Sequence, residues 1–248
     1  LAIYYAGSID KFVDIMNQYA DSLGCTGSHF ANTHGMSDSN HYTTARDLYL
    51  IFSQAIDHDL FREICSKTNY TVPATNVSSQ RDLVTSNVLI DQNSDYYYDW
   101  AVLGKTGTTS SAGSCLLCLA DKDGERMISV VMGANYYTYG GRRYSECFSQ
   151  TRDLISWGYD NFGYHTLLSE GQVITQVPVK YGRGTEYVNA IAIDKAVVYS
   201  GNYDAQENVE YNIQLSSQDP IPAPVKKGAD LGTVQVLLNG EVVWEGSL

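Results

Sequence analysis

Apolar residues recur three and four positions apart in the first quarter of the chain, and this spacing predicts two amphipathic helices. The first begins after Ser8, which can cap it, and ends at Gly24. The second begins near Thr43 or Thr44, with Asp47 three residues after Thr44 as in a capping box. Their apolar positions are Phe12, Ile15, Met16, Tyr19, Ala20 and Leu23, and Leu48, Ile51, Phe52 and Ala55.

The segment between these helices, residues 28–42, is polar and rich in Gly and Asn, which predicts a structured loop. A short helix over residues 57–65 follows. Residues 121–124, Asp-Lys-Asp-Gly, predict a hairpin turn, and residues 144–162 a last long helix. Strands are predicted over residues 70–73, 84–89, 101–103, 113–120 and 127–133.

The composition changes after Gly163. Four of the five prolines lie beyond it, and none of the cysteines does. Short β-like runs with turn signals between them predict a small all-β domain; they cover residues 172–179, 189–200, 208–215 and 231–246. We therefore predict an α/β (α+β) domain, residues 1–165, with an antiparallel sheet and flanking helices, followed by a β-sandwich, residues 166–248.

Composition excludes several classes of function. The 248 residues contain 16 Lys and Arg against 28 Asp and Glu, a net charge of −12, so phosphate backbones are repelled and nucleic acid is not an expected partner. The apolar runs are shorter than the roughly 20 residues of a membrane-spanning helix. The first residues lack the basic region and the cleavage site of a signal peptide.

The five cysteines are an odd number scattered among core-like residues, which argues against a disulfide framework. Cys115 and Cys118 form a CxxC sequence. They lie three apart in an alternating run, so their side chains should point to opposite faces of a strand. We therefore expect neither a redox pair nor a zinc knuckle there.

A metal site is a second hypothesis. His29, His34 and His41 cluster near Asp38 and Asp47, and imidazole is a common zinc ligand. Their spacing matches neither HExxH nor a two-cysteine, two-histidine pattern. Loop histidines that hydrogen-bond the backbone of an ordered segment explain the cluster more simply, so no metal or cofactor is expected.

Residues 103–109, Leu-Gly-Lys-Thr-Gly-Thr-Thr, carry the sharpest chemical signal. A phosphate-binding P-loop would need glycine at position 99, where Asp99 stands, and a strand precedes the glycine instead of a loop. A Lys-Thr-Gly edge strand of a penicillin-recognising serine acyltransferase is the mechanistic interpretation that remains. A surface turn is the structural alternative.

The surrounding sequence carries a resemblance to a known family. Residues 28–52, 85–90 and 96–134 resemble the low-molecular-mass penicillin-binding proteins, which are D-alanyl-D-alanine carboxypeptidases of bacterial cell-wall metabolism. Residues 170–182 and 224–241 resemble the C-terminal domain of the same enzymes. The resemblance thus covers nearly the whole chain and implies an extracytoplasmic protein of the cell envelope.

This resemblance implies a serine hydrolase that removes the terminal D-alanine from peptidoglycan stem peptides through an acyl-enzyme, and that β-lactams inhibit. It implies that Lys105 positions the negative end of the substrate. Thr106 and Thr108 would address the terminal carboxylate and, through the Thr108 N–H, the oxyanion. Gly107 would leave room for the substrate. Arg143 resembles an arginine near the substrate carboxylate, although Arg142 or a simple surface charge are alternatives.

The family's Ser-x-x-Lys nucleophile and Ser-x-Asn motif precede the segment aligned with residues 1–7. We expect this chain to contain no Ser-x-x-Lys sequence and no functional Ser-x-Asn, and Ser37–Asn40, inside the polar loop, receives no role. We therefore expect a chain truncated at its N-terminus, which alone neither hydrolyses D-Ala-D-Ala nor is labelled by penicillin. It should expose an apolar edge and face, compensated by dimerisation, swapping or a retained N-terminal fragment. Any peripheral membrane association would use segments outside this chain.

A noncatalytic module that binds the cell wall or a partner protein is the third hypothesis. It rests on the tyrosines at positions 96–98 and on those at 136, 137 and 139, because exposed aromatic rings anchor glycans and proteins. Packing of residues 96–98 against the Lys-Thr-Gly strand is the structural alternative.

Overall fold

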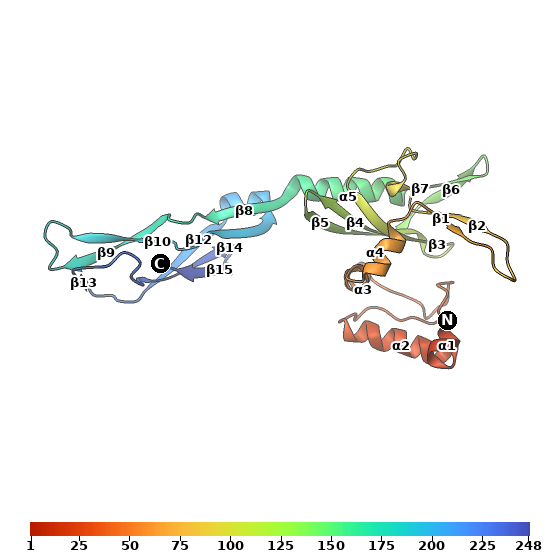
Figure 1. Cartoon of the computed structure of the whole chain (residues 1–248), viewed down its shortest axis with the longest axis horizontal. Helices are drawn as coiled ribbons and strands as arrows, with labels where there is room; N and C mark the ends of the chain where they lie inside the picture. Colours follow the sequence, from red (N-terminus) through yellow and green to blue (C-terminus); the bar gives the residue numbers. More distant parts are fainter. The chain divides into compact units, whose positions relative to one another are not determined.

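The computed structural model describes the backbone of residues 1–248 and all side chains except those of Arg142, Arg143, Tyr203 and Gln206. The chain divides into two compact units, Leu1–Trp157 and Gly158–Leu248, each of which is described by itself (Figure 1). The predicted domain boundary at residues 165 and 166 falls inside a strand of the second unit and stays a prediction. Among the described residues, no helix is both long enough and apolar enough to span a bilayer.

Four helices begin the N-terminal unit: α1 (Ala2–Ala6), α2 (Ile9–Ser22), α3 (Ala45–Ile56) and α4 (Asp59–Cys65). The Ser8 hydroxyl caps α2 by accepting a hydrogen bond from the Lys11 N–H, and Thr44 caps α3 in the same way from Asp47. Both predicted caps are confirmed. The short helix over 57–65 is confirmed as α4.

The Asp47 carboxylate does more than a capping box requires. It is buried and accepts hydrogen bonds from the Gly27 N–H (2.8 Å) and the Ser28 hydroxyl (2.7 Å), which belong to the polar loop. The Ser28 hydroxyl in turn contacts Thr43 Oγ1 at 2.7 Å. The side chain expected to close the helix cap therefore fastens the polar loop to α3.

The main sheet of this unit contains β3 (Ala101–Thr109), β4 (Gly113–Lys122) and β5 (Glu125–Ala134) in the antiparallel order β3-β4-β5. Its helix-covered side packs Phe52 of α3 against Leu103 and Leu119. Helix α5 (Cys147–Asn161) runs along the other side (Figure 1). The predicted antiparallel sheet with flanking helices is confirmed, and β4 is its central strand.

The alternation predicted for β4 is also confirmed. Cys118 is fully buried and Cys115 is partly exposed, as expected for residues three apart on a strand. The turn between β4 and β5 has positive φ at Asp123 (56°) and Gly124 (91°), the signature of a two-residue type I′ hairpin turn. All five cysteines are free thiols.

The predicted strand over residues 84–89 is wrong. Strands β1 (Asn69–Val72) and β2 (Arg81–Val84) form a hairpin, and a 3₁₀ turn, η1 (Val88–Ile90), follows. The Thr85 hydroxyl accepts from the Asn87 N–H, and the side-chain Oδ1 of Asn87 accepts from the Leu89 N–H. These local bonds compete with strand pairing and end the strand.

The last predicted helix starts later than residue 144. A hairpin of β6 (Tyr136–Tyr139) and β7 (Arg142–Ser145) precedes α5. Gly140 and Gly141, with φ of 59° and 78°, form its turn, which needs two residues in the left-handed region. The Gly-Gly pair is therefore the turn of a hairpin, and the helix begins only at Cys147.

The C-terminal unit is β-rich, as predicted, with one short helix that the sequence did not predict. Its sheets have the orders β11-β8, β10-β9-β13 and β12-β14-β15, and their pairs are antiparallel except β13 with β9. Its elements are β8 (Phe162–Leu168), β9 (Val173–Lys180), β10 (Tyr187–Ile191), β11 (Ala196–Gly201), α6 (Asn202–Glu207), β12 (Val209–Leu215), β13 (Ile221–Pro222), β14 (Gly232–Leu238) and β15 (Glu241–Ser247).

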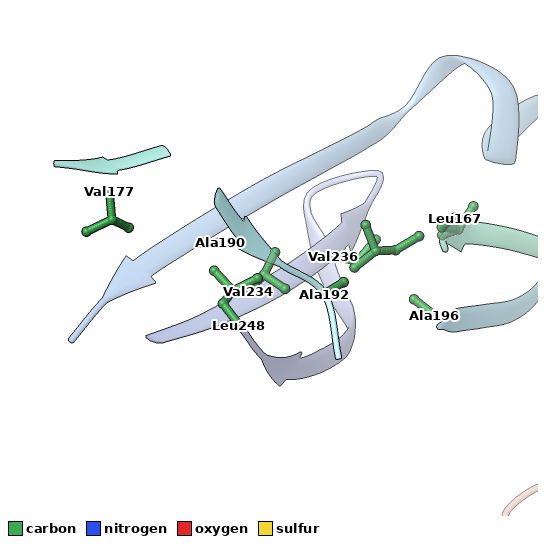
Figure 2. Packing of buried hydrophobic residues seen from close by; sticks show 9 residues of the cluster. Leu167, Val177, Ala190, Ala192, Ala196, Val234, Val236 and Leu248 are labelled. Atoms are coloured by element: carbon green, nitrogen blue, oxygen red, sulfur yellow. The ribbon is translucent and has the colours of Figure 1, made fainter. Parts of the chain in front are cut away.

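One apolar cluster closes the C-terminal unit. Alternate residues of β14, including Val234 and Val236, are fully buried, which is the pattern of a strand with one face on a core. Figure 2 shows these side chains with Leu167, Ala190 and Leu248 around them. Residues from different sheets thus share one interior.

Candidate functional site

The Lys-Thr-Gly sequence lies on β3, at the edge of the main sheet. In the described part of the chain β3 has one strand neighbour, β4, so its other edge is open. Lys105 and Thr106 line a cleft of about 640 Å³ beside this edge. The apolar wall of the cleft comes from α4 and the β1–β2 hairpin, through Leu60, Ile64, Val72, Leu83 and Val84.

Lys105 is exposed within this cleft. Its ammonium donates a hydrogen bond to the carbonyl oxygen of Thr106. Cys65, at the end of α4, also lines the cleft. Burial raises the pKa of the Cys65 thiol, and the positive charge of Lys105 opposes that rise. The predicted binding lysine therefore faces a cavity, which Lys67 also lines.

The two threonines of β3 bond to different neighbours. Thr106 Oγ1 lies 2.6 Å from the Ser86 hydroxyl, and Thr108 Oγ1 lies 3.4 Å from the Ser114 hydroxyl on β4. Ser114 also donates to the buried Cys147 thiol (3.4 Å) at the start of α5. Thr106 thus faces the cleft, while Thr108 is tied to the sheet and α5.

The two glycines of β3 differ in their surroundings. A Cβ on Gly107 would meet nothing within 4 Å, so open space lies beside it. A Cβ on Gly104 would lie 2.6 Å from the Leu117 carbonyl oxygen and 2.7 Å from Asn87 Nδ2. Gly104 is therefore required by packing, whereas Gly107 leaves a gap that a ligand could fill.

Arg143 completes the predicted substrate-binding set. Its backbone belongs to β7, but its side chain, like that of Arg142, lies outside the described residues. Its predicted role near a carboxylate stays a prediction.

The expectation that no Ser-x-x-Lys sequence is present needs correction, because Ser8–Lys11 spells it once. The Ser8 hydroxyl is engaged as the cap of α2. Ser-x-Asn also occurs, at Ser200–Asn202, where β11 meets α6 in the C-terminal unit and the Asn202 amide donates to the Asp160 carbonyl oxygen. We assign no catalytic role to either sequence.

The clustered histidines bond to the backbone of the polar loop. His29 Nδ1 contacts the Asn40 carbonyl oxygen (2.6 Å), His34 Nδ1 accepts from the Met36 N–H (3.2 Å), and His41 Nδ1 accepts from the Ala31 N–H (3.2 Å). Among the described side chains, no three His, Cys, Asp or Glu groups gather as metal ligands would.

The tyrosine runs have two different environments. Tyr96 packs against Phe148 with ring centroids 5.7 Å apart, and the Tyr98 hydroxyl lies 2.9 Å from that of Ser156, so this run lies against α5. Tyr137 stacks on Tyr144 across the β6–β7 hairpin at 5.3 Å, and Tyr139 is exposed. The rings of the first run are partly buried, whereas Tyr137 and Tyr139 of the second are exposed.

Two family models match the chain. Residues 1–136 match D-alanyl-D-alanine carboxypeptidase, and residues 162–248 match penicillin-binding protein 5, C-terminal domain. The D-alanyl-D-alanine carboxypeptidase DacA of Haemophilus influenzae is 29% identical over 251 residues, which cover 100% of this chain and 58% of the relative. DacF of Bacillus subtilis is 26% identical over 245 residues, which cover 99% and 59%. The chain thus spans under three-fifths of the length of both relatives.

Solved structures agree with these matches. Penicillin binding protein 5 from Haemophilus influenzae aligns with a TM-score of 0.59 at 29% identity, over 99% of this chain and 66% of that one. Penicillin binding protein 6B from Escherichia coli has a TM-score of 0.61 at 22% identity, over 100% and 62%, and supports the fold alone. The N-terminal unit is therefore a penicillin-binding-protein type of domain with Lys-Thr-Gly on its edge strand. The chain belongs to the D-alanyl-D-alanine carboxypeptidase family.

Sequence reasoning found the Lys-Thr-Gly strand but not its support. Ser86 and Asn87 reach β3 from the turn after β2, within the segment 84–89 that the sequence predicts as a strand. A signal was present, since Thr-Ser-Asn is a run of residues that bond their own backbone and break strands.

Proposed function

We propose that the cleft beside β3 binds the D-alanyl-D-alanine end of peptidoglycan stem peptides, and that the protein functions in D-Ala-D-Ala carboxypeptidase chemistry of the serine type, which β-lactams inhibit. The observation that carries the proposal is the position of Lys105 and Thr106. They line a cleft at an open strand edge, in a chain of the carboxypeptidase family.

Each residue of β3 has a role in this proposal. The Lys105 ammonium leaves the Thr106 carbonyl oxygen and, with the Thr106 hydroxyl, binds the terminal carboxylate. The substrate backbone extends along the open edge, past the gap at Gly107. The Thr108 N–H donates to the oxyanion that forms on the scissile carbonyl. Arg143 adds positive charge near the same carboxylate.

The chemical step needs a serine that this chain is not assigned to supply. Its Oγ would attack the penultimate carbonyl carbon and release D-alanine, and water would then hydrolyse the ester. We therefore propose that the 248-residue chain alone binds the dipeptide end without turnover and is not labelled covalently by penicillin. Stoichiometric labelling of the chain, seen by intact mass, would contradict this.

Binding is testable without turnover. A ¹⁵N NMR titration with N-acetyl-D-Ala-D-Ala should shift the amides of residues 105–108, and the L,L dipeptide should shift them less. Lys105→Ala removes the cation and should weaken binding at least tenfold, since a charge-assisted bond contributes about 1.5–3 kcal/mol. Lys195→Ala, an exposed lysine of the C-terminal unit, is the matched control. Equal shifts in the Lys105→Ala and Lys195→Ala variants would reject the site.

Gly107→Ala tests the proposed path of the substrate. A Cβ at this position meets no protein atom, so the variant should fold normally. It should nevertheless bind the dipeptide more weakly, because the methyl group occupies the space assigned to the ligand. Unchanged affinity in a folded variant would place the substrate elsewhere.

The proposed activity implies where the protein acts. A carboxypeptidase of stem peptides acts outside the cytoplasm, at the bacterial cell envelope, and we propose that location.

The apolar groove of about 550 Å³ on α1 and α2 would be covered by a second copy of the chain or by another polypeptide segment. Light scattering across a range of concentrations should show association, and a monomer at all concentrations would reject self-association.

A further inference from the structure

Ser86 contacts the candidate site from outside β3. It lies in the turn after β2, twenty residues before Thr106, and its hydroxyl is 2.6 Å from Thr106 Oγ1. This distance is typical of a strong hydroxyl–hydroxyl hydrogen bond. Both residues line the cleft that contains Lys105. The predicted site does not include Ser86.

The turn that carries Ser86 is held on both sides. The Thr85 N–H donates to the Thr68 carbonyl oxygen (2.8 Å), which fixes the turn to the segment after α4. The Asn87 N–H donates to Thr85 Oγ1 (3.1 Å), and the Asn87 side chain accepts from the Leu89 N–H (3.3 Å). Ser86 is therefore placed by bonds made by its neighbours and not by Thr106 alone.

The same turn packs directly against the β3 backbone. Asn87 is 2% exposed, and a Cβ on Gly104 would lie 2.7 Å from its Nδ2. Gly104 immediately precedes Lys105. The absence of a side chain at 104 thus lets the turn approach β3 at the point where the binding residues begin.

The chemistry of two bonded hydroxyls restricts the direction of the bond. A hydroxyl has one proton and two lone pairs, so Thr106 can donate to only one acceptor. If Ser86 accepts from Thr106, that proton is used within the protein. If Ser86 donates, the Thr106 proton is free for a carboxylate in the cleft, and an anion held there by Lys105 favours this direction.

We propose that Ser86 is a positioning residue for substrate binding: it donates its proton to Thr106 Oγ1, fixes the rotamer of Thr106 and leaves the Thr106 hydroxyl proton to bond the ligand carboxylate. The identity of the ligand rests on the proposed function. The control of Thr106 by Ser86 does not, because it concerns two side chains of the free protein.

Two measurements on the 248-residue chain test the proposal. The first is the χ1 rotamer of Thr106 in the free protein, from NMR scalar couplings. The second is the Kd for N-acetyl-D-Ala-D-Ala. Ser86→Ala should spread Thr106 over more than one rotamer and weaken binding about three- to tenfold, the range of one net hydrogen bond. Ser86→Thr keeps the hydroxyl and should restore both values.

Ser37→Ala is the matched control, because Ser37 makes a bond of the same length (2.6 Å) to Ser111 beyond the end of β3. It should change neither value. A single unchanged Thr106 rotamer in Ser86→Ala overturns the proposal. So does weaker binding that Ser86→Thr fails to restore.

The outcome also separates the inference from the proposed function. If the unmodified chain binds no dipeptide, the proposed function fails. The proposal for Ser86 then stands on a Thr106 rotamer that is lost in Ser86→Ala and restored in Ser86→Thr, and falls if the rotamer does not move.

Discussion

The two units of the chain bury their apolar residues in different arrangements. The C-terminal unit gathers nine buried residues into one cluster and caps it with partly buried side chains such as Trp244. The N-terminal unit buries apolar side chains on both faces of its main sheet, with the Phe52 cluster on one face and Leu116 and Cys118 on the other. Some apolar side chains of α1 and α4, such as Tyr4 and Leu60, are exposed at 94% and 66%. The first unit is therefore layered around one sheet that carries the candidate chemistry, and the second closes one interior shared by several sheets.

Because each unit has buried apolar residues of its own, we expect the two units to unfold in separate transitions. Tryptophan fluorescence can separate them, because Trp100 and Trp157 belong to the N-terminal unit and Trp244 to the other. A Trp244→Phe protein reports the N-terminal unit. The double variant Trp100→Phe, Trp157→Phe reports the C-terminal unit.

The largest effect is expected from Phe52→Ala. Phe52 is buried between α3 and the sheet, and the truncation should cost about 3–5 kcal/mol because it leaves a cavity. In urea, the N-terminal unit should unfold at a lower denaturant concentration, and the transition reported by Trp244 should not change. If both transitions moved together, the units would not unfold independently.

Val236→Ala should destabilise the C-terminal unit instead, and by less. Val236 is fully buried and pairs with Trp244 across β14 and β15, so losing its methyl groups should cost roughly 2 kcal/mol. Only the Trp244 transition should shift. Val243→Ala, at a partly exposed position of the same hairpin, should move it much less.

Acid should weaken the N-terminal unit first. Hydrogen bonds from the Ser28 hydroxyl and the Gly27 N–H hold the pKa of the Asp47 carboxyl below its usual range. A lowered pKa contributes stability above the unfolded value of about 3.9, and this contribution is lost as the pH falls through the folded value. Asp47→Asn should make the N-terminal transition less stable at pH 7 and less dependent on pH. An equal acid response in both proteins would contradict this.

The smallest effect is expected in thiol labelling, which reports the opening of the N-terminal unit alone. All five cysteines lie in this unit. Burial raises the pKa of Cys118 to about 12, so at pH 8 only about one thiol in 10⁴ is a thiolate. In native protein iodoacetamide should modify Cys115, which is partly exposed, well before Cys118, as read by peptide mass. Rapid native modification of Cys118 would contradict its burial.

The sequence predicted best those elements whose signals are local. The caps of α2 and α3 come from single residues, Ser8 and Thr44, that bond one turn away. The β4–β5 hairpin follows from Asp123 and Gly124, which tolerate positive φ. Such features depend on a few neighbouring residues, so the pattern alone was sufficient.

Features that depend on distant residues were missed. Strand β2 stops at Val84 because Thr85 and Asn87 bond within their own turn, and Ser86 becomes relevant only when Thr106 lies against it. The extension of β3 through Thr109 is set by pairing with β4. The Lys-Thr-Gly residues were predicted as a group, but the cleft beside them needs α4 and β1, which no local pattern brings together.

The contrast between the glycines of β3 reaches beyond this chain. At Gly104 the nearest obstacle is the backbone oxygen of Leu117, which no side-chain replacement can move, so alanine should be rejected there whatever occupies position 87. At Gly107 no such obstacle exists. In a mutational scan that measures protein abundance, position 104 should therefore reject substitution and position 107 should tolerate it. Only a selection for β-lactam or peptide recognition should make position 107 as intolerant as position 104.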